Sequence, residues 1–400
     1  MPSTATRDAG ARRGGVELAH FWAEGDGRAM LDAVLEAFDR RHPEVRVEDR
    51  SYDNHGLAIK SRILREDPPS LFVEWPDRNL EPYHRAGAIR NITDVWEDNG
   101  WADAFIEGAR ERSRMGGEYV AVPVDIHRMN NVFYNVELAE EMGVAPARVD
   151  DPREFLEVLE ACDAGGLVGM EQPKKNPSTL VQLFTNIFIG QFGASAFAEL
   201  TREDPAGLES ELREALELVD AYSELASEDA AFLDMVDASD RFVARESVFF
   251  HQGDWMAGEY ADVTDYDYGR DWGRVNFPGT DGVYVMGVDS VVAAENAGFG
   301  PDTRTFLEFV GSPEALEILN RIKGSIPPRR DISLDSYPQF LQEQFADFER
   351  ADHFPAGHAL QITPGAFVEV KTAFSDFLAD RDPAATATKL VDAYQVGLDG

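Results

Sequence analysis

The 400-residue chain is long enough for two domains of ordinary size, and its 44% hydrophobic and 10% aromatic residues are typical of a globular protein with large cores. Its net charge of -37, from 74 acidic and 37 basic residues, excludes ordinary binding to nucleic acid and disfavours an anionic membrane surface. Cys162 is the single cysteine, which excludes an intrachain disulfide and a cysteine metal cluster. No apolar run approaches the roughly 18 residues of a membrane span.

The first part of the chain alternates between strands and helices. After a small, polar and glycine-rich tail at 1–15, strands are predicted at 16–23, 45–52 and 70–75, separated by amphipathic helices at 28–41 and 56–66. This alternation is typical of parallel βαβ units, which bind ligands at the carboxyl ends of their strands.

The pattern changes after residue 123. Residues 118–136 contain two strand-like segments that join across Asp125 to Asn130 without a helix. A mostly helical region follows up to residue 255, although 247–255 also resembles a buried strand, and the acidic segment 261–274 is predicted to be a solvated loop. An apolar strand is expected within 283–296, and the remaining predicted helices lie at 304–311, 313–324, 369–381 and 385–396.

This order of elements predicts two lobes with an interlobe hinge. The N-terminal lobe is expected to comprise 16–123 plus 288–330, and the C-terminal lobe 124–287 plus 331–400. The helix at 313–324 should end at Gly324, because Pro327 and Pro328 cannot continue it.

Seven stretches, taken in order, resemble one family. They are AHFWAEGDG, ILREDPPSLF, VPVDIHRMNNVFYN, FFHQGDWMAGE, NFPGTDGVYVMGVDS, KGSIPPRRD and GHALQITPGAF. The chain resembles the sugar-binding components of ABC importers, most closely the glucose-type branch of extracellular solute-binding family 1. The resemblance implies an α/β, two-lobed type II periplasmic-binding-protein (Venus flytrap) fold that closes around a sugar. It implies no catalysis, no cofactor and no metal. A monosaccharide such as glucose or a close relative is the expected ligand, a membrane permease the expected partner, and a monomer the expected state.

The expected location follows from the family and from the start of the chain. Sugar-binding components of this kind work at the extracellular face of the cell membrane, where a lipid anchor is expected in the full-length protein. The segment at 1–15 holds an Arg-Arg pair without an apolar stretch after it, so it is not a complete secretion signal. A genuine start at Met1 would favour the cytoplasm.

Aromatic side chains are the first candidates for the site, because a sugar presents patches of C–H on its ring faces. Trp22 follows the first strand, at a place where the family often has two tryptophans and this chain has Phe21 before it. Trp255 matches the second aromatic wall of the family. Each tryptophan has a competing interpretation as a core residue, and Trp75 is either a rim or a packing residue.

Polar candidates are those that would hold hydroxyl groups. Asp289 interrupts an apolar strand, where an unpaired carboxylate is costly to bury. Lys323 is one of only six lysines in a chain that prefers arginine, and its compact ammonium suits a tight cleft. Glu24 and Glu74 are further acidic candidates, in a chain whose 74 carboxylates are expected mostly at the surface. The resemblance adds Asp125, His127 and His358 to the candidate ligand contacts.

Other functions remain open at this stage. The chain contains no HExxH, GxSxG or GxxxxGK[ST] motif, but a carbohydrate-active enzyme needs only two suitably spaced carboxylates. A binding protein for a disaccharide, an oligosaccharide or another small polar solute is the main alternative. An amino-acid or peptide ligand would need fixed charge partners, which Lys323 and Asp289 would supply.

The acidic residues are spread through apolar-periodic segments, as on a folded surface, and arginine replaces most lysines. This combination resembles the proteins of extreme halophiles, in which a Debye length of about 3 Å at 1 M salt screens the self-repulsion. We therefore expect the melting temperature to rise between dilute buffer and molar KCl. A thermal unfolding series in KCl checks this, and an unchanged melting temperature would contradict it.

Overall fold

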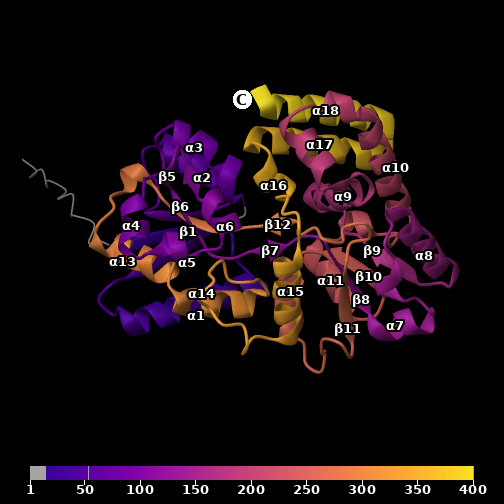
Figure 1. Cartoon of the computed structure of the whole chain (residues 1–400), viewed down its shortest axis with the longest axis horizontal. Coiled ribbons are helices and arrows are strands. Elements are labelled where there is room, and N and C mark those ends of the chain that lie inside the picture. Colours follow the sequence, from indigo (N-terminus) through magenta and orange to yellow (C-terminus); the bar gives the residue numbers. More distant parts are fainter. Residues whose placement is uncertain (1–14, 53, 400) are drawn as a thin grey trace, which may run out of the picture.

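The computed structural model describes residues 15–52 and 54–399, which form two α/β lobes with one main sheet each (Figure 1). Residues 1–14 of the predicted tail lie outside the described residues. In Figure 1 the chain begins in the left lobe, builds most of the right lobe, returns to the left lobe with α13 (Pro301–Val310) and α14 (Pro313–Lys323), and ends in the right lobe. Chain order and spatial order therefore differ.

The first lobe is built on a five-stranded sheet in the order β2-β1-β3-β13-β6. Its strands are β1 (Val16–His20), β2 (Val47–Ser51), β3 (Leu71–Glu74), β6 (Ala121–Pro123) and β13 (Ser290–Ala293). Its other helices are α1 (Gly25–Arg41), α2 (His55–Leu64), α3 (Glu81–Arg85), α4 (Thr93–Asp98), α5 (Trp101–Ala104) and α6 (Glu107–Arg112), and a small hairpin joins β4 (Arg114–Met115) to β5 (Glu118–Tyr119). The predicted parallel βαβ units are confirmed, because β1 pairs in parallel with both β2 and β3.

One edge of this sheet collects the ends of several strands. Strand β13 runs antiparallel to its neighbours, and Ser290 pairs with Glu74 of β3 and with Pro123 of β6. The amino end of β13 therefore lies beside the carboxyl ends of β3 and β6. Residues Trp75, Asp125 and Asp289, which come just beyond these strands, are brought to the same edge.

The second lobe is built on a four-stranded sheet in the order β11-β8-β10-β9. Its strands are β8 (Asn131–Asn135), β9 (Val168–Glu171), β10 (Ser247–Gln252) and β11 (Trp272–Asn276). Its helices are α7 (Val136–Glu141), α8 (Pro152–Ala164), α9 (Pro177–Arg202), α10 (Glu209–Glu224), α11 (Met235–Val243), α12 (Trp255–Ala261), α15 (Gln339–Arg350), α16 (His358–Gln361), α17 (Pro364–Asp380) and α18 (Pro383–Asp399). The interpretation of 247–255 as a buried strand is confirmed by β10, whereas the mostly helical interpretation of this region missed β9.

The prediction of a solvated loop at 261–274 is wrong in its second half. Trp272 begins β11 and is 4% exposed, and its ring packs 5.0 Å from that of Tyr260 and 5.5 Å from that of Phe340. Tyr266 and Tyr268 pack against the same apolar cluster. The acidic residues between them suggested solvent exposure, whereas the alternating aromatic side chains decide the packing.

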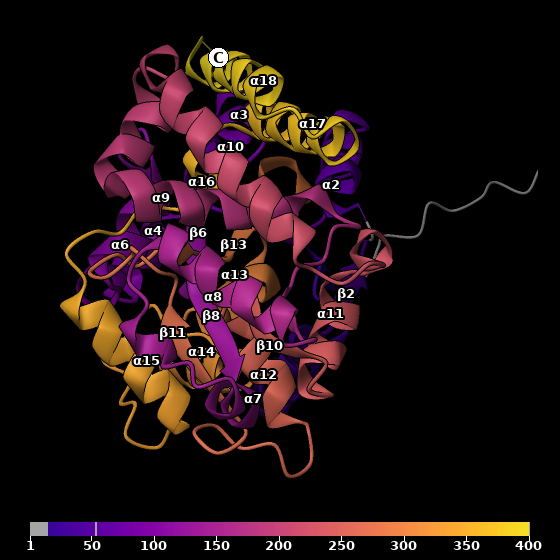
Figure 2. The same cartoon turned by 90° about the vertical axis from the view of Figure 1, so that its right-hand side faces the viewer.

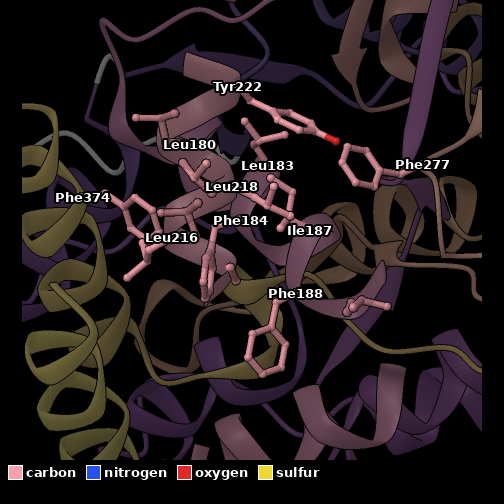
Figure 3. Packing of buried hydrophobic residues seen from close by; sticks show 14 of the residues in the cluster. Leu180, Leu183, Phe184, Ile187, Phe188, Leu216, Leu218, Tyr222, Phe277 and Phe374 are labelled. Carbon is pink, nitrogen blue, oxygen red and sulfur yellow. The ribbon is translucent and has the colours of Figure 1, made fainter. Parts of the chain in front are cut away.

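Helix α9 forms the centre of the second lobe's core. Figure 3 shows Leu180, Leu183 and Phe184 of α9 among residues of α10 and α17, and the rings of Phe184 and Phe374 lie 5.4 Å apart. Among the described residues, α9 is a helix that is long and apolar enough, by length and composition, to cross a membrane. The sequence was expected to contain no such segment. However, 61% of its most apolar window is buried inside the protein, as in a core helix. Helix α18 packs on α10 and α17 beside it (Figure 2).

Three segments cross between the lobes side by side. Strand β7 (His127–Arg128) pairs with β12 (Met286–Gly287), and Figure 1 shows both between the two lobes. The third segment follows α14, and its Ile326 forms a bridge with Ile126. The apolar side chains of these segments form one small buried cluster with residues of both lobes, including Ile106 and Leu360. The crossings are therefore packed together rather than exposed as separate linkers.

Candidate functional site

A cavity of about 790 Å³ lies between the two lobes. From the first lobe, the cavity is lined by residues after β1, by the residue after β3, by the residue before β13 and by the last residue of α14. These residues are Phe21, Glu24, Asp26, Trp75, Asp289 and Lys323. The second lobe contributes the amino ends of α9, α11, α16 and α17 and the residues that follow β10. Six of the nine predicted site residues line this cavity: Glu24, His127, Trp255, Asp289, Lys323 and His358.

A second hollow, of about 1020 Å³, lies at the outer edge of the first sheet beside β1 and β2. Its walls come from the first lobe alone, and they hold an ion pair in which Arg62 Nη2 lies 2.9 Å from Glu17 Oε2. The interlobe cavity is the better candidate, because it combines aromatic rings from both lobes with buried polar groups.

Aromatic rings line the interlobe cavity from both sides. Trp255 begins α12 directly after β10, and its ring meets His127 edge-on, with the centroids 5.4 Å apart. Phe21 and Trp75 lie on the first lobe with their rings 6.2 Å apart, and Phe367 lies 6.5 Å from Trp75 on the other side. Trp22 is 5% exposed and is not among the lining residues, so Phe21 and not Trp22 faces the cavity.

Lys323 forms an ion pair with Asp26. Its Nζ lies 2.8 Å from Oδ2 of Asp26, and both side chains are largely buried. The backbone N–H of Asp26 donates to Oε1 of Glu259 across the lobes, at 3.1 Å. Burial lowers the pKa of Lys323, but Asp26 and the more distant Asp289 outweigh this effect, so the pKa lies above its ordinary value and the ammonium stays charged.

Gly324 ends α14, as predicted, in the left-handed conformation with φ 76°. A Cβ at this position would lie 2.8 Å from the carbonyl oxygen of Asp254 and 2.8 Å from the nitrogen of Gly258. A side chain would therefore push α12 away from α14. The glycine both terminates the helix and allows the lobes to touch beside Lys323.

His127 is held by a buried carboxylate. Its Nδ1 lies 2.5 Å from Oδ1 of Asp254, whose Oδ2 accepts the backbone N–H of Arg128 at 2.8 Å. Burial alone would lower the pKa of His127, but the carboxylates of Asp125 and Asp254 raise it well above its ordinary value. The Arg128 guanidinium pairs with Asp347 at 2.7 Å, which gives it a structural role.

Two carboxyl groups of the first lobe at this edge, those of Asp289 and Glu74, have pKa values above the ordinary range. Burial and the neighbouring charge of Asp125 raise the pKa of Asp289 to about 7. Burial raises the pKa of Glu74 to about 7 as well. Asp125 is fully buried, and neither Asp125 nor Glu74 is among the cavity-lining residues. These two predicted contacts therefore lie behind the wall that Asp289 and His127 form.

His358 lines the cavity, but both of its ring nitrogens form hydrogen bonds to other side chains of the protein. Nε2 lies 2.6 Å from the hydroxyl of Tyr394, and Nδ1 is close to Thr185 Oγ1. Burial lowers the pKa of His358 to about 3, so the ring is neutral. A ligand would therefore meet the ring carbons of His358 rather than a free nitrogen.

Three acidic residues around the site are not among the nine predicted contacts. Asp26, Asp254 and Glu259 are indistinguishable in composition from the many surface carboxylates of this chain. Their signal is positional, since Asp26 follows β1 and Asp254 follows β10, at strand ends that face the cavity. Only the tertiary structure shows that Asp26 meets Lys323, that Asp254 meets His127, and that Glu259 meets Asp26 across the lobes.

Two lobes that surround a cavity and are joined by three packed crossings define the class of two-lobed binding proteins. The chain belongs to the bacterial extracellular solute-binding proteins, whose family model matches residues 29–346. This confirms the predicted fold and the resemblance to extracellular solute-binding proteins. The assignment to a glucose-type branch stays a prediction.

Individual relatives agree with this family. The chain is 33% identical over 389 residues to the xylose/arabinose-binding protein XacG of Haloferax volcanii, covering 94% of this chain and 84% of the relative. Among solved structures, the bacterial solute receptor AcbH, described as preferring β-D-galactopyranose, matches with a TM-score of 0.83 at 16% identity, over 96% of this chain and 99% of that one. A chitin oligosaccharide binding protein matches with a TM-score of 0.83 at 15% identity, over 96% and 99%.

The raised pKa of Glu74 predicts a pH dependence of stability. In the folded protein this buried carboxyl keeps its proton up to about pH 7, whereas in the unfolded chain it loses it near its ordinary value of 4.5. The folded state therefore binds more protons between these values, and the free energy of unfolding falls as the pH rises through this window.

The Glu74→Gln variant should lose this contribution. We expect the slope of unfolding free energy against pH to become shallower by up to about 1.4 kcal/mol per pH unit between pH 5 and 7. Denaturant unfolding at constant molar KCl measures the slope, with Glu97→Gln, an exposed glutamate, as the matched control. Equal slopes in both variants would contradict the prediction.

Proposed function

We propose that the protein is the substrate-binding component of an ABC importer and captures a small sugar between its two lobes. The observation that carries this proposal is the interlobe cavity, in which Trp255 and Phe21 from opposite lobes flank Asp289 and Lys323. Aromatic faces suit the C–H patches of a sugar, and charged groups form the stronger hydrogen bonds to its hydroxyls. The proposed partner is a membrane permease, and the proposed place of action is the extracellular face of the membrane.

A monosaccharide is the proposed ligand, with pentoses now among the candidates beside glucose. The relative with 33% identity is named for xylose and arabinose, which supports a single sugar ring. The cavity volume of about 790 Å³ favours a second candidate, a disaccharide or oligosaccharide, since it lies in the upper part of the roughly 300–1,000 Å³ range of small-molecule sites.

Closure of the lobes is the proposed mechanism. The bodies that move are proposed to be 16–123 plus 288–330 and 124–287 plus 331–400, and the hinge lies where Ile126 bridges Ile326 and β7 pairs with β12. The sugar stabilises the closed form to the extent that it contacts both lobes only there. No chemical step is proposed.

Titration calorimetry tests the ligand class. We expect heat of binding in molar KCl with at least one of xylose, arabinose, glucose or galactose. Maltose and trehalose test the second candidate. An amino-acid mixture tests the charge-pair alternative, which the ion pair between Lys323 and Asp26 makes less favourable. Heat with amino acids alone, or turnover of glucosides by the purified protein, would overturn the proposal.

Two substitutions test the cavity itself. We expect Trp255→Ala and Lys323→Arg each to weaken sugar binding by more than tenfold, which is about 1.4 kcal/mol, because the first removes a wall and the second puts a planar guanidinium in place of a compact ammonium. We choose Lys323→Arg as the test rather than Lys323→Met. Methionine would leave the buried Asp26 without its cation and would also destabilise the fold.

The matched controls are Lys389→Arg, which keeps an exposed ion pair with Asp376, and Phe232→Ala, which removes an exposed ring. Both should bind the sugar like the parent protein. Parental affinity in Trp255→Ala and Lys323→Arg would show that the sugar binds elsewhere.

A further inference from the structure

Three metal-binding side chains converge behind and at the wall of the interlobe cavity. Asp125 and His127 lie on the first crossing segment, and Asp289 lies just before β13. One ligand atom from each lies within 4.8 Å of the others, and all three side chains are buried. His127 and Asp289 also line the cavity, so the cluster is open on one side.

Asp125 has a carboxylate oxygen whose hydrogen-bonding capacity is unmet. Its Oδ1 accepts the backbone N–H of Asp289 at 2.7 Å. Its Oδ2 has no hydrogen-bond partner among the described residues, although it lies 3.3 Å from Nε2 of His127. A fully buried carboxylate oxygen without a donor costs free energy, on the order of 1–3 kcal/mol or more for a charged group, unless a cation or a proton compensates it.

The other two side chains are already oriented for coordination. Asp254 fixes Nδ1 of His127, which leaves Nε2 facing the two carboxylates. The indole N–H of Trp22 donates to Oδ2 of Asp289 at 3.3 Å, which holds that carboxylate from behind. A histidine held by a carboxylate on its far nitrogen is the usual support of a metal ligand.

The ammonium of Lys323 does not satisfy Asp125 by direct contact. Lys323 places its ammonium 2.8 Å from Asp26, which leaves Asp125 and Asp289 to share His127 between them. Two carboxylates that face one imidazole at the edge of a cavity are a ligand set for a divalent cation, with the remaining coordination positions directed to the cavity.

We propose that Asp125 Oδ2, His127 Nε2 and Asp289 form a site for one divalent transition-metal ion such as Zn²⁺ or Co²⁺. One imidazole and two carboxylates suit these metals better than Ca²⁺, which prefers six to eight oxygen ligands. The site does not depend on the proposed function, since its ligands are all protein side chains. The competing arrangement is an imidazolium of His127 shared between Asp125 and Asp254, with no metal.

Metal titration of the full chain, freed of metal by chelator and kept in molar KCl, tests the site. We expect one equivalent of Co²⁺ to bind with visible absorption bands, Zn²⁺ to displace it, and X-ray absorption of the zinc form to show one imidazole nitrogen. The variants Asp125→Asn and His127→Gln should each weaken Co²⁺ binding by more than tenfold. Asp98→Asn, which changes an exposed carboxylate, should bind like the parent.

Each contrary result decides against the site. Binding that is equal in the parent, Asp125→Asn and His127→Gln would show that surface carboxylates hold the metal. No binding to the parent would show that the imidazolium arrangement is sufficient. If Asp125→Asn fails to fold, as judged by circular dichroism, Asp289→Asn replaces it, and parental affinity in that variant would overturn the proposal.

Discussion

The carboxylate of Asp254 is the interaction on which the architecture of the site depends. It is fully buried, and it accepts hydrogen bonds from the backbone of Arg128, from Gln344 and from the ring of His127. These contacts join the first crossing segment to the end of β10 and to α15. Because two donors lie on the first crossing segment and the third on α15, the carboxylate links the crossing, α15 and the start of the Trp255 helix.

The close contact of the two lobes near Lys323 rests on small residues. Gly25 has a positive φ of 55°, and a Cβ there would meet the carboxylate of Glu259, while Gly258 would meet the carbonyl oxygen of Ile322. Glycine at both positions lets α1 and α14 approach α12 from the opposite lobe. A compact lysine fits this contact, since the ion pair with Asp26 spans only a short gap. Lys323 and Asp26 are thus held where the ends of α1 and α14 meet α12.

The chain carries two kinds of acidic residue with opposite consequences. The exposed carboxylates form pairs such as Arg304 with Asp94 and Asp98, which contribute little individually and depend on salt. The few buried ones, at the facing edges of the lobes, have their acidity set by desolvation and by one another. Solvent exposure, and not residue type, distinguishes the surface carboxylates from the carboxylates that form the site.

The sequence by itself determined the alternation of the first lobe and the end of α14 at Gly324, because these follow from local periodicity and backbone conformation. Residue usage singled out the rare Lys323, which lines the cavity. It did not predict β11 or β9, since their residues lie among acidic or helix-like segments and β11 pairs with a distant strand. Only the tertiary structure placed Phe21 rather than Trp22 on the cavity wall, and only it brought Asp125, His127 and Asp289 together. Which carboxylates of a strongly acidic chain become buried depends on contacts between segments more than one hundred residues apart, and the local sequence does not specify which segments meet.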